Sequence, residues 1–358
     1  MKRLIASLLT LIVAVALRGA SPEFASLPEY KPSRQVTGVI RSWGNPHMAG
    51  LMKNWEEGFK KYQPGIFFID NLKSTAMAPF GLFESVADLA VMGRRIYTYE
   101  YYGVYRRSLM LPVEIAVATG SYNVPHKSFA LTVFVHRDNP VSQLTLAQLD
   151  GIFGAERLGG WQGLKWNRGS ARGVKTNLRT WGQLGLTGEW ATKPIHLYGP
   201  PGIYPGGTSF FQSRVMGGAD TWAEGLQEFE DRGKMMEALS HDPLGIAYTG
   251  VCYQTPQTKP VALAEGEGTP FVLPTRETVA NRTYPLSRLV YLSFAPDQPG
   301  GDVTDPKADP KVEEFLRYIL SRQGQEDVAR EGDYLPLTAA MITEQLALLN
   351  NPSAAQPK

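Results

Sequence analysis

The sequence predicts an α/β protein with two lobes, and three observations support this. The chain has 358 residues, enough for about two domains of ordinary size. Short apolar runs alternate with amphipathic helical stretches, which is typical of mostly parallel sheets with flanking helices. A strand, a small polar loop and a helix start follow one another three times, at residues 43–48, 70–76 and 198–209.

The first strand is expected at residues 36–43, and a helix follows it. Asn45 is suited to cap this helix and Pro46 to occupy its first position. The apolar residues of the helix fall on one face: Met48, Leu51, Met52, Trp55, Phe59 and Tyr62. A strand at 66–70, a helical stretch at 73–86 and an apolar strand at 88–92 complete this first group.

The rest of the chain continues the alternation. Further strands are expected at residues 114–119, 130–136, 195–198, 245–249 and 287–294. Helices are expected at 145–153, with Thr145 as the cap, and beginning at Thr208 and Pro310. Residues 158–175 are rich in glycine and arginine and are predicted to be surface loop, and 351–358 a loose tail.

The N-terminus has the pattern of a secretory signal. Lys2 and Arg3 precede an apolar run over residues 4–17, which is too short to span a bilayer. Ala14 and Ala16 form an A-x-A cleavage site, so residues 1–25 are expected to be signal peptide and lead-in. A buried core helix is the alternative. The single cysteine, Cys252, is far from this site, so a lipid-modified N-terminal cysteine is not expected.

Composition excludes several classes of function. The net charge is +2, too small for broad binding to nucleic acid. The five histidines show no HxxxH or HExxH spacing, so neither a metal nor another cofactor is expected. The sequence contains no G-x-S-x-G motif and no P-loop, so the chain is not expected to be an enzyme.

The three strand–loop–helix units predict an anion site. A helix N-terminus offers unpaired N–H groups and a partial positive charge, and parallel strands present such loops at one edge of a sheet. Side chains in the loops can add hydroxyl donors, and Arg94 a charged one. The candidate ligand-binding residues are Gly44, Asn45, His47, Ser74, Thr75, Arg94, Gly206, Gly207, Thr208 and Ser209.

These features also have structural explanations. Each loop can simply cap its helix, His47 can be a solvated side chain, and Arg94 with Arg95 can be a surface pair. Several aromatic residues can be ligand-stacking platforms, core residues or packing between the lobes. They are Tyr97, Tyr99, Tyr101, Tyr102, Tyr105, Trp161, Trp166, Trp181 and Trp190.

Seven segments in the same order make the sequence similar to a known family. They are residues 40–59, 87–95 with Glu100, 139–161, 195–211, 245–248, 284–288 and 315–337. Together they resemble the phosphate-type solute-binding proteins of ABC importers, the PstS-like branch of the type II periplasmic binding proteins. Among the quoted pieces are Gly93-Arg94-Arg95, Gly206-Gly207-Thr208 and Tyr284-Pro285-Leu286-Ser287-Arg288.

The resemblance implies two α/β lobes joined by two crossover segments, with the ligand in the cleft between them. Lobe one would comprise residues 36–120 and 255–350, including the return crossover, and lobe two residues 121–254. This sequence departs from the family at Pro46, at Gly93 and Gly206, where a serine is usual, and at Pro200, where an arginine is usual.

The implied function is capture of a small oxyanion, phosphate or a similar ion, in the periplasm. The partner would be an ABC permease in the inner membrane, and the protein itself would be a monomer. A sensor or a surface or biofilm protein with an altered ligand site is the alternative, and a secreted hydrolase the more distant one.

Overall fold

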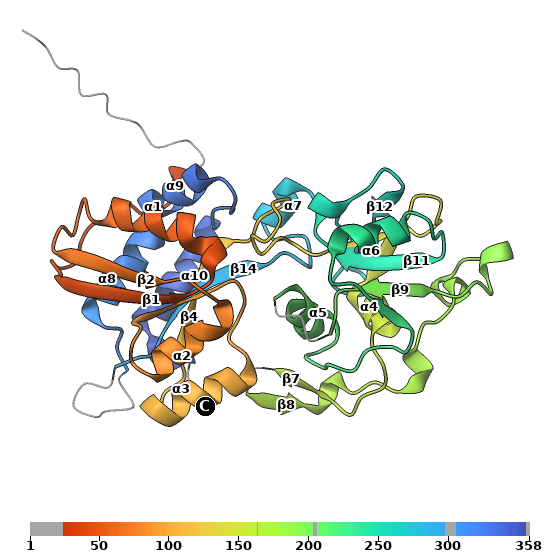
Figure 1. The fold of residues 1–358 in the computed structure, drawn as a ribbon, viewed down its shortest axis with the longest axis horizontal. Helices are drawn as coiled ribbons and strands as arrows, with labels where there is room; N and C mark the ends of the chain where they lie inside the picture. Colours follow the sequence, from red (N-terminus) through yellow and green to blue (C-terminus); the bar gives the residue numbers. More distant parts are fainter. Residues whose placement is uncertain (1–23, 163, 203–205, 298–305, 356–358) are drawn as a thin grey trace, which may run out of the picture.

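A computed structural model describes residues 24–162, 164–202, 206–297 and 306–355. The predicted signal peptide therefore lies outside the described residues, apart from its last two positions. The described chain forms two five-stranded sheets, each covered by helices in its own lobe (Figure 1). The two-lobed α/β fold predicted from the sequence is confirmed.

The first sheet has the strand order β2-β1-β3-β14-β4. Its strands are β1 (Gly38–Gly44), β2 (Ile66–Asn71), β3 (Leu89–Met92), β4 (Val113–Thr119) and β14 (Leu289–Phe294). β1 is parallel to both β2 and β3, whereas β14 is antiparallel to β3 and β4. The sheet is mixed because β4 leads toward the other lobe and β14 brings the chain back.

The second sheet repeats this arrangement in the order β10-β9-β11-β5-β12. Its strands are β5 (Thr132–His136), β9 (His196–Gly199), β10 (Leu226–Glu228), β11 (Gly245–Thr249) and β12 (Thr258–Pro260). β9 is parallel to its two neighbours, whereas β5 is antiparallel to both of its own. Both sheets are thus mixed rather than mostly parallel. Two short pairs accompany them: β6 (Gln143–Thr145) with β13 (Ala262–Ala264), and β7 (Gly160–Gln162) with β8 (Lys165–Asn167).

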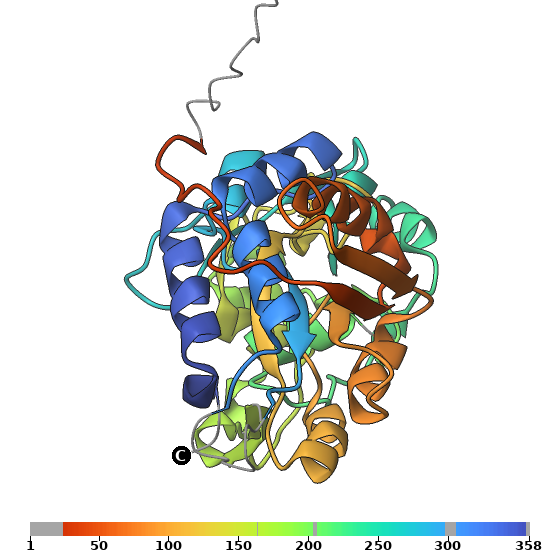
Figure 2. The ribbon, with the colours of Figure 1, turned by 90° about the vertical axis from the view of Figure 1, so that its left-hand side faces the viewer.

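Helices flank both sheets (Figures 1 and 2). In the first lobe they are α1 (Ala49–Phe59), α2 (Ala78–Phe83), α3 (Thr98–Ser108), α8 (Pro310–Ile319), α9 (Arg322–Glu331) and α10 (Ala339–Asn350). In the second lobe they are α4 (Leu146–Phe153), α5 (Gly207–Val215), α6 (Arg232–Leu239) and α7 (Arg276–Ala280). Short 3-10 turns are η2 (Pro46–Met48), η3 (Thr75–Met77), η4 (Arg168–Ser170), η5 (Val174–Thr176), η6 (Trp181–Leu184), η7 (Gly188–Trp190), η8 (Val251–Tyr253) and η10 (Pro352–Ala355). Among the described residues, no helix is both long and apolar enough to cross a bilayer.

The helices predicted from apolar periodicity are present. The predicted face of α1 is buried in the first core at Leu51, Met52, Trp55 and Phe59. The cap of α4 is also confirmed, because the Thr145 hydroxyl accepts from the backbone N–H of Gln148 at 3.1 Å. η10 gives the predicted loose tail one short turn, and residues 356–358 lie outside the described chain.

Several elements were not predicted. Besides α3 and the β7–β8 hairpin they are β6, β10, β12, β13, α6, α7, α9 and α10. α3 does not show an apolar stripe, because its tyrosines stay exposed or half-buried and, among its described apolar side chains, only Val104 is buried. The β7–β8 hairpin lies in the stretch predicted to be surface loop. Its strands have three residues each, too few to show a period of two.

The two crossovers between the lobes lie side by side. The Gly120 N–H donates to the Arg288 carbonyl at 2.9 Å, and the Leu131 N–H to the Leu286 carbonyl at 3.1 Å. Leu286 belongs to the second core, whereas Val290 belongs to the first. The chain therefore returns to the first lobe near residue 288, later than the predicted boundary at 255, because residues 258–286 still pack on the second sheet.

The lead-in is part of the first core. Phe24, Leu27 and Tyr30 are buried there. The Tyr30 hydroxyl donates to the Glu314 carboxylate at 2.7 Å, and the Arg322 N–H donates to the Pro28 carbonyl at 2.8 Å. Residues 24–30 thus tie the start of the described chain to α8 and α9.

We expect Tyr30→Phe to lower the free energy of unfolding by about 1.5–3 kcal/mol, because Glu314 is fully buried and loses a donor to its charge. Urea unfolding followed by circular dichroism measures this. Tyr62→Phe is the control, since it removes a hydroxyl from a ring packed against Tyr30 at 5.2 Å. Equal unfolding midpoints for Tyr30→Phe and the wild type would contradict the assigned bond.

Candidate functional site

Two of the three predicted loops begin at neighbouring strand ends. β1 pairs with β2 up to Trp43↔Asn71, and with β3 up to Gly44↔Val91. The segments after β1, β2 and β3 therefore leave the same edge of the first sheet. The third loop follows β9 in the second sheet and leads into α5.

The first loop is built around Gly44 and Asn45. Gly44 has φ +153°, and a Cβ there would lie 2.1 Å from the Val91 carbonyl oxygen, so only glycine fits. The buried Asn45 side chain accepts from the His47 N–H at 3.0 Å and so caps η2. This was the predicted cap, although it begins a 3-10 turn that continues into α1.

His47 is exposed beside the crossover. Its ring stacks on that of His126, with centroids 5.6 Å apart. Partial burial and the neighbouring His126 and Lys127 lower the pKa of His47. Lys127 itself is paired with Glu331 at 3.1 Å and Asp333 at 2.9 Å. His47 thus packs against the crossover that leads into the second lobe.

The second loop holds Ser74 and Thr75 at the edge strand of the sheet. The Ser74 hydroxyl accepts from the Ala76 N–H at 3.2 Å and caps η3. Both residues are half-buried. They lie one strand further out than Asn45, because β2 is the outermost strand.

Arg94 follows β3 and is held by Glu100. Its guanidinium donates two hydrogen bonds of 2.8 Å to the two carboxylate oxygens and lies 3.5 Å from the centre of the Tyr97 ring. Burial opposes the charge of Arg94, but the bonds to Glu100 outweigh it and raise the pKa of the guanidinium. Its Nε is buried without a hydrogen-bond partner among the described residues. Arg94 is therefore an internal ion pair rather than a surface pair with Arg95.

The third loop ends in the start of α5. Gly206 has φ +89° and precedes the helix, and no side chain caps it. The Ser209 hydroxyl donates to the Gly206 carbonyl at 3.0 Å. Thr208 is fully buried, with its hydroxyl 3.4 Å from the Pro201 carbonyl, so its side chain faces the protein. The backbone N–H groups of the first turn are the donors that this helix start offers.

Arg288 is a candidate site residue that the sequence did not predict. It lies at the return crossover and is 6% exposed. Its Nη2 donates to the Gly93 carbonyl at 3.0 Å, and its guanidinium lies 5.6 Å from the centre of the Phe210 ring on α5. Burial and the charge of Arg232 lower its pKa to about 10. Among the described residues it has no acidic partner.

Arg288 brings several predicted residues together. A Cβ on Gly206 would lie 3.7 Å from its Nη2, and one on Gly93 would lie 2.6 Å from the Asn45 amide nitrogen. The Ser128 hydroxyl also donates to the Gly93 carbonyl, at 3.1 Å. The Gly93 carbonyl and the start of α5 therefore lie beside one buried guanidinium, and Asn45 and Ser128 lie against Gly93. The described contacts do not link Ser74 or Thr75 to it.

The sequence held one signal for Arg288. A single arginine stands directly before the apolar run 289–294, where a charge has no place in an ordinary core strand. Ser128 gave no such signal, because serine is common in loops. Its φ of +53° belongs to the folded crossover and is not visible in a sequence.

Comparison with known proteins defines the class. Residues 35–323 match the family model described as a PBP superfamily domain. The phosphate-binding protein PstS of Pseudomonas aeruginosa is 34% identical over 351 residues, 97% of this chain and 98% of that protein. The chain belongs to the PBP superfamily, and within it to the PstS-like branch. This is a family of solute-binding proteins and not of enzymes.

Solved structures share the fold. An ABC-type phosphate transport receptor from Vibrio cholerae aligns with a TM-score of 0.52 at 19% identity, covering 83% of this chain and 99% of that one. PstS from Borrelia burgdorferi aligns with a TM-score of 0.53 at 15% identity, covering 84% and 99%. At these identities the alignments support the two-lobed fold alone.

Proposed function

We propose that this protein captures phosphate between its two lobes and delivers it to an ABC importer. The observation that carries the proposal is Arg288, a buried guanidinium without an acidic partner in the described chain, beside the uncapped start of α5. A buried charge is costly unless something compensates it. An anion bound at this position supplies the compensation.

In the proposed site both lobes contribute donors. Arg288 supplies the charge, the N–H groups at Gly207, Thr208 and Ser209 supply directed hydrogen bonds, and the residues after β1 and β3 close the other side. Arg94 takes part through its buried Nε, since Glu100 already occupies its other nitrogens. Ligand contacts with both lobes favour closure about the paired crossovers.

The family and the N-terminal pattern support the rest of the proposal. The protein is exported to the periplasm by a cleavable signal peptide, carries no lipid anchor and works as a monomer with an inner-membrane permease. Because Phe24 is buried in the first core, cleavage falls before it. N-terminal sequencing of the exported protein should give a start between about residues 17 and 24.

Titration calorimetry with phosphate and with sulfate tests the function. Binding of phosphate with a single site per chain is the expected result. Binding of sulfate alone would keep the anion site but change the solute. A folded protein that binds neither would favour the alternative of a sensor or surface protein with an altered site, which the departures at Pro46, Gly93, Gly206 and Pro200 motivate.

Thr208→Val tests which part of α5 makes the contact. We expect phosphate affinity to change by less than about threefold, because the hydroxyl is buried near the Pro201 carbonyl and the backbone N–H remains. Ser209→Pro, which removes one N–H donor, should weaken binding by about tenfold. A large loss with Thr208→Val, measured by calorimetry, would show that the hydroxyl and not the helix start holds the ligand.

A further inference from the structure

The β7–β8 hairpin carries an exposed pair of tryptophans. Trp161 and Trp166 face each other across the hairpin in register, with ring centroids 5.4 Å apart and planes at 73°. They are 46% and 47% exposed. In Figure 1 the hairpin extends from the second lobe along the lower side of the molecule toward α3 of the first lobe.

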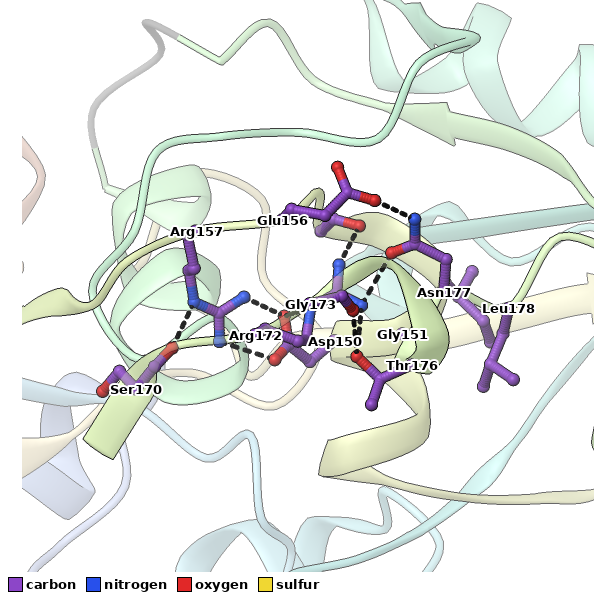
Figure 3. Close-up of polar contacts among 12 residues, drawn as sticks. Asp150, Gly151, Glu156, Arg157, Ser170, Arg172, Gly173, Thr176, Asn177 and Leu178 are labelled. Atoms are coloured by element: carbon purple, nitrogen blue, oxygen red, sulfur yellow. Dashed lines mark hydrogen bonds and ion pairs between the residues drawn. The ribbon is translucent and has the colours of Figure 1, made fainter. Parts of the chain in front are cut away.

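The base of this hairpin is clamped (Figure 3). The Arg157 guanidinium donates to both oxygens of Asp150, at 2.7 and 2.6 Å, and to the Ser170 carbonyl at 2.7 Å. Arg157 and Arg172 exchange two backbone hydrogen bonds of 2.9 Å. The segments before β7 and after β8 are therefore both fixed to α4, so the two tryptophans lie on a rigid hairpin.

The hairpin is also seated on the segment that follows α5. A Cβ on Gly160 would lie 2.0 Å from the Gly217 carbonyl oxygen, and one on Gly218 would lie 1.9 Å from the Trp161 carbonyl oxygen. Such close backbone approach is possible only with glycine at both positions. The hairpin thus moves with α5, whose start is part of the proposed phosphate site.

The helix toward which the hairpin extends in Figure 1, α3, presents a second aromatic surface. Tyr99 and Tyr102 lie three residues apart on α3, so they share one face of the helix, and they are 69% and 49% exposed. The start of α3 is fixed by Glu100, which accepts from the Tyr97 N–H at 2.8 Å and pairs with Arg94. This surface is therefore attached to the first-lobe side of the same site.

We propose that Trp161 and Trp166 pack against the Tyr99–Tyr102 face of α3 when the lobes close, and so retain the bound ligand. This inference rests on the proposed capture of ligand between the lobes. Each of the two aromatic surfaces is the binding partner of the other. Each is rigidly attached to one half of the proposed site, and the hairpin already extends toward α3. Aromatic contacts made only in the closed state slow opening and not capture.

A crosslinking experiment tests the contact. Trp161→Cys and Tyr99→Cys are combined in a Cys252→Ala background, and disulfide formation is followed with and without inorganic phosphate. The control pair is Val174→Cys with Tyr99→Cys, because Val174 is 68% exposed but lies beyond the clamped base. We expect the first pair to crosslink at least tenfold faster than the control, and phosphate to accelerate only the first pair.

The outcomes separate the two proposals. If the first pair crosslinks no faster than the control under either condition, the aromatic contact is wrong, whatever calorimetry says of phosphate. If it crosslinks faster but phosphate changes nothing, the contact stands and phosphate is not the closing ligand. A second variant, Trp161→Ala with Trp166→Ala, should release phosphate about tenfold faster with an unchanged association rate. An unchanged release rate would overturn the retention role.

Discussion

Arg288→Met is expected to abolish most of the phosphate affinity, with a loss of about 100-fold or more. A guanidinium that gives two hydrogen bonds to an anion contributes about 1.5–3 kcal/mol through each, and 1.4 kcal/mol corresponds to tenfold in affinity. The ligand-free protein should not lose stability, because the variant replaces a buried charge that lacks an acidic partner among the described residues. Calorimetry and thermal unfolding of the same preparation measure both effects.

Affinity and melting temperature together distinguish a binding residue from a structural one. An arginine with a purely structural role would lower the melting temperature when removed, and affinity would fall only as a consequence. Arg137→Met is the matched control, because Arg137 is exposed after β5 and should change neither quantity. Phosphate binding by Arg288→Met at wild-type affinity would remove Arg288 from the site and leave Arg94 as the charged candidate.

Gly120→Ala is expected to lower the free energy of unfolding by about 3 kcal/mol, the upper end of the range for overpacking. An added Cβ would lie 2.0 Å from the Ser128 carbonyl oxygen, and backbone cannot move aside as a side chain can. The Gly120 N–H also joins the two crossovers through the Arg288 carbonyl. Phosphate affinity should fall as well, because the same shift displaces Arg288 and Ser128.

Gly103→Ala is the counterpart of this substitution. Gly103 lies within α3, and a Cβ there meets no atom within 4 Å. Alanine should therefore raise the free energy of unfolding by about 0.5–1 kcal/mol through helix propensity alone. Urea unfolding of the two variants beside the wild type gives both free energies of unfolding. A Gly120→Ala protein as stable as the wild type would mean that the two crossovers can move apart without loss of stability.

Local patterns predicted the fold well where one segment determines its own structure. The caps at Asn45 and Thr145 and the buried face of α1 follow from neighbours a few residues apart. α3 was missed because its stability depends on an N-terminal bond to Glu100 and on one buried valine rather than on a full apolar stripe. The mixed sheets were not predicted because the direction of a strand such as β14 depends on the chain returning from the other lobe, which local patterns do not show.

The site was predicted only in part, for a related reason. The loops after β1 and β9 could be predicted because each contains glycine and polar residues and is followed by a helix. Arg94 was predicted to supply a charged donor, but Glu100, six residues further along the chain, pairs with its guanidinium. Arg288 joins the candidate site from a distant part of the chain, because it donates to the carbonyl of Gly93, 195 residues earlier. Pairing and long-range approach are properties of the folded molecule and are not encoded in local spacing.

The placement of β14 determines the order in which the molecule can be completed. This strand lies between β3 and β4, yet it follows the whole second lobe in the chain. Because the chain is synthesised from its N-terminus, all strands of the second sheet are made before β14, while β3 and β4 still have unpaired edges. Those edges are a hazard for association between chains until residues 289–294 arrive. Truncated or stalled chains ending before β14 should consequently aggregate through the first lobe, while their second lobe is already folded.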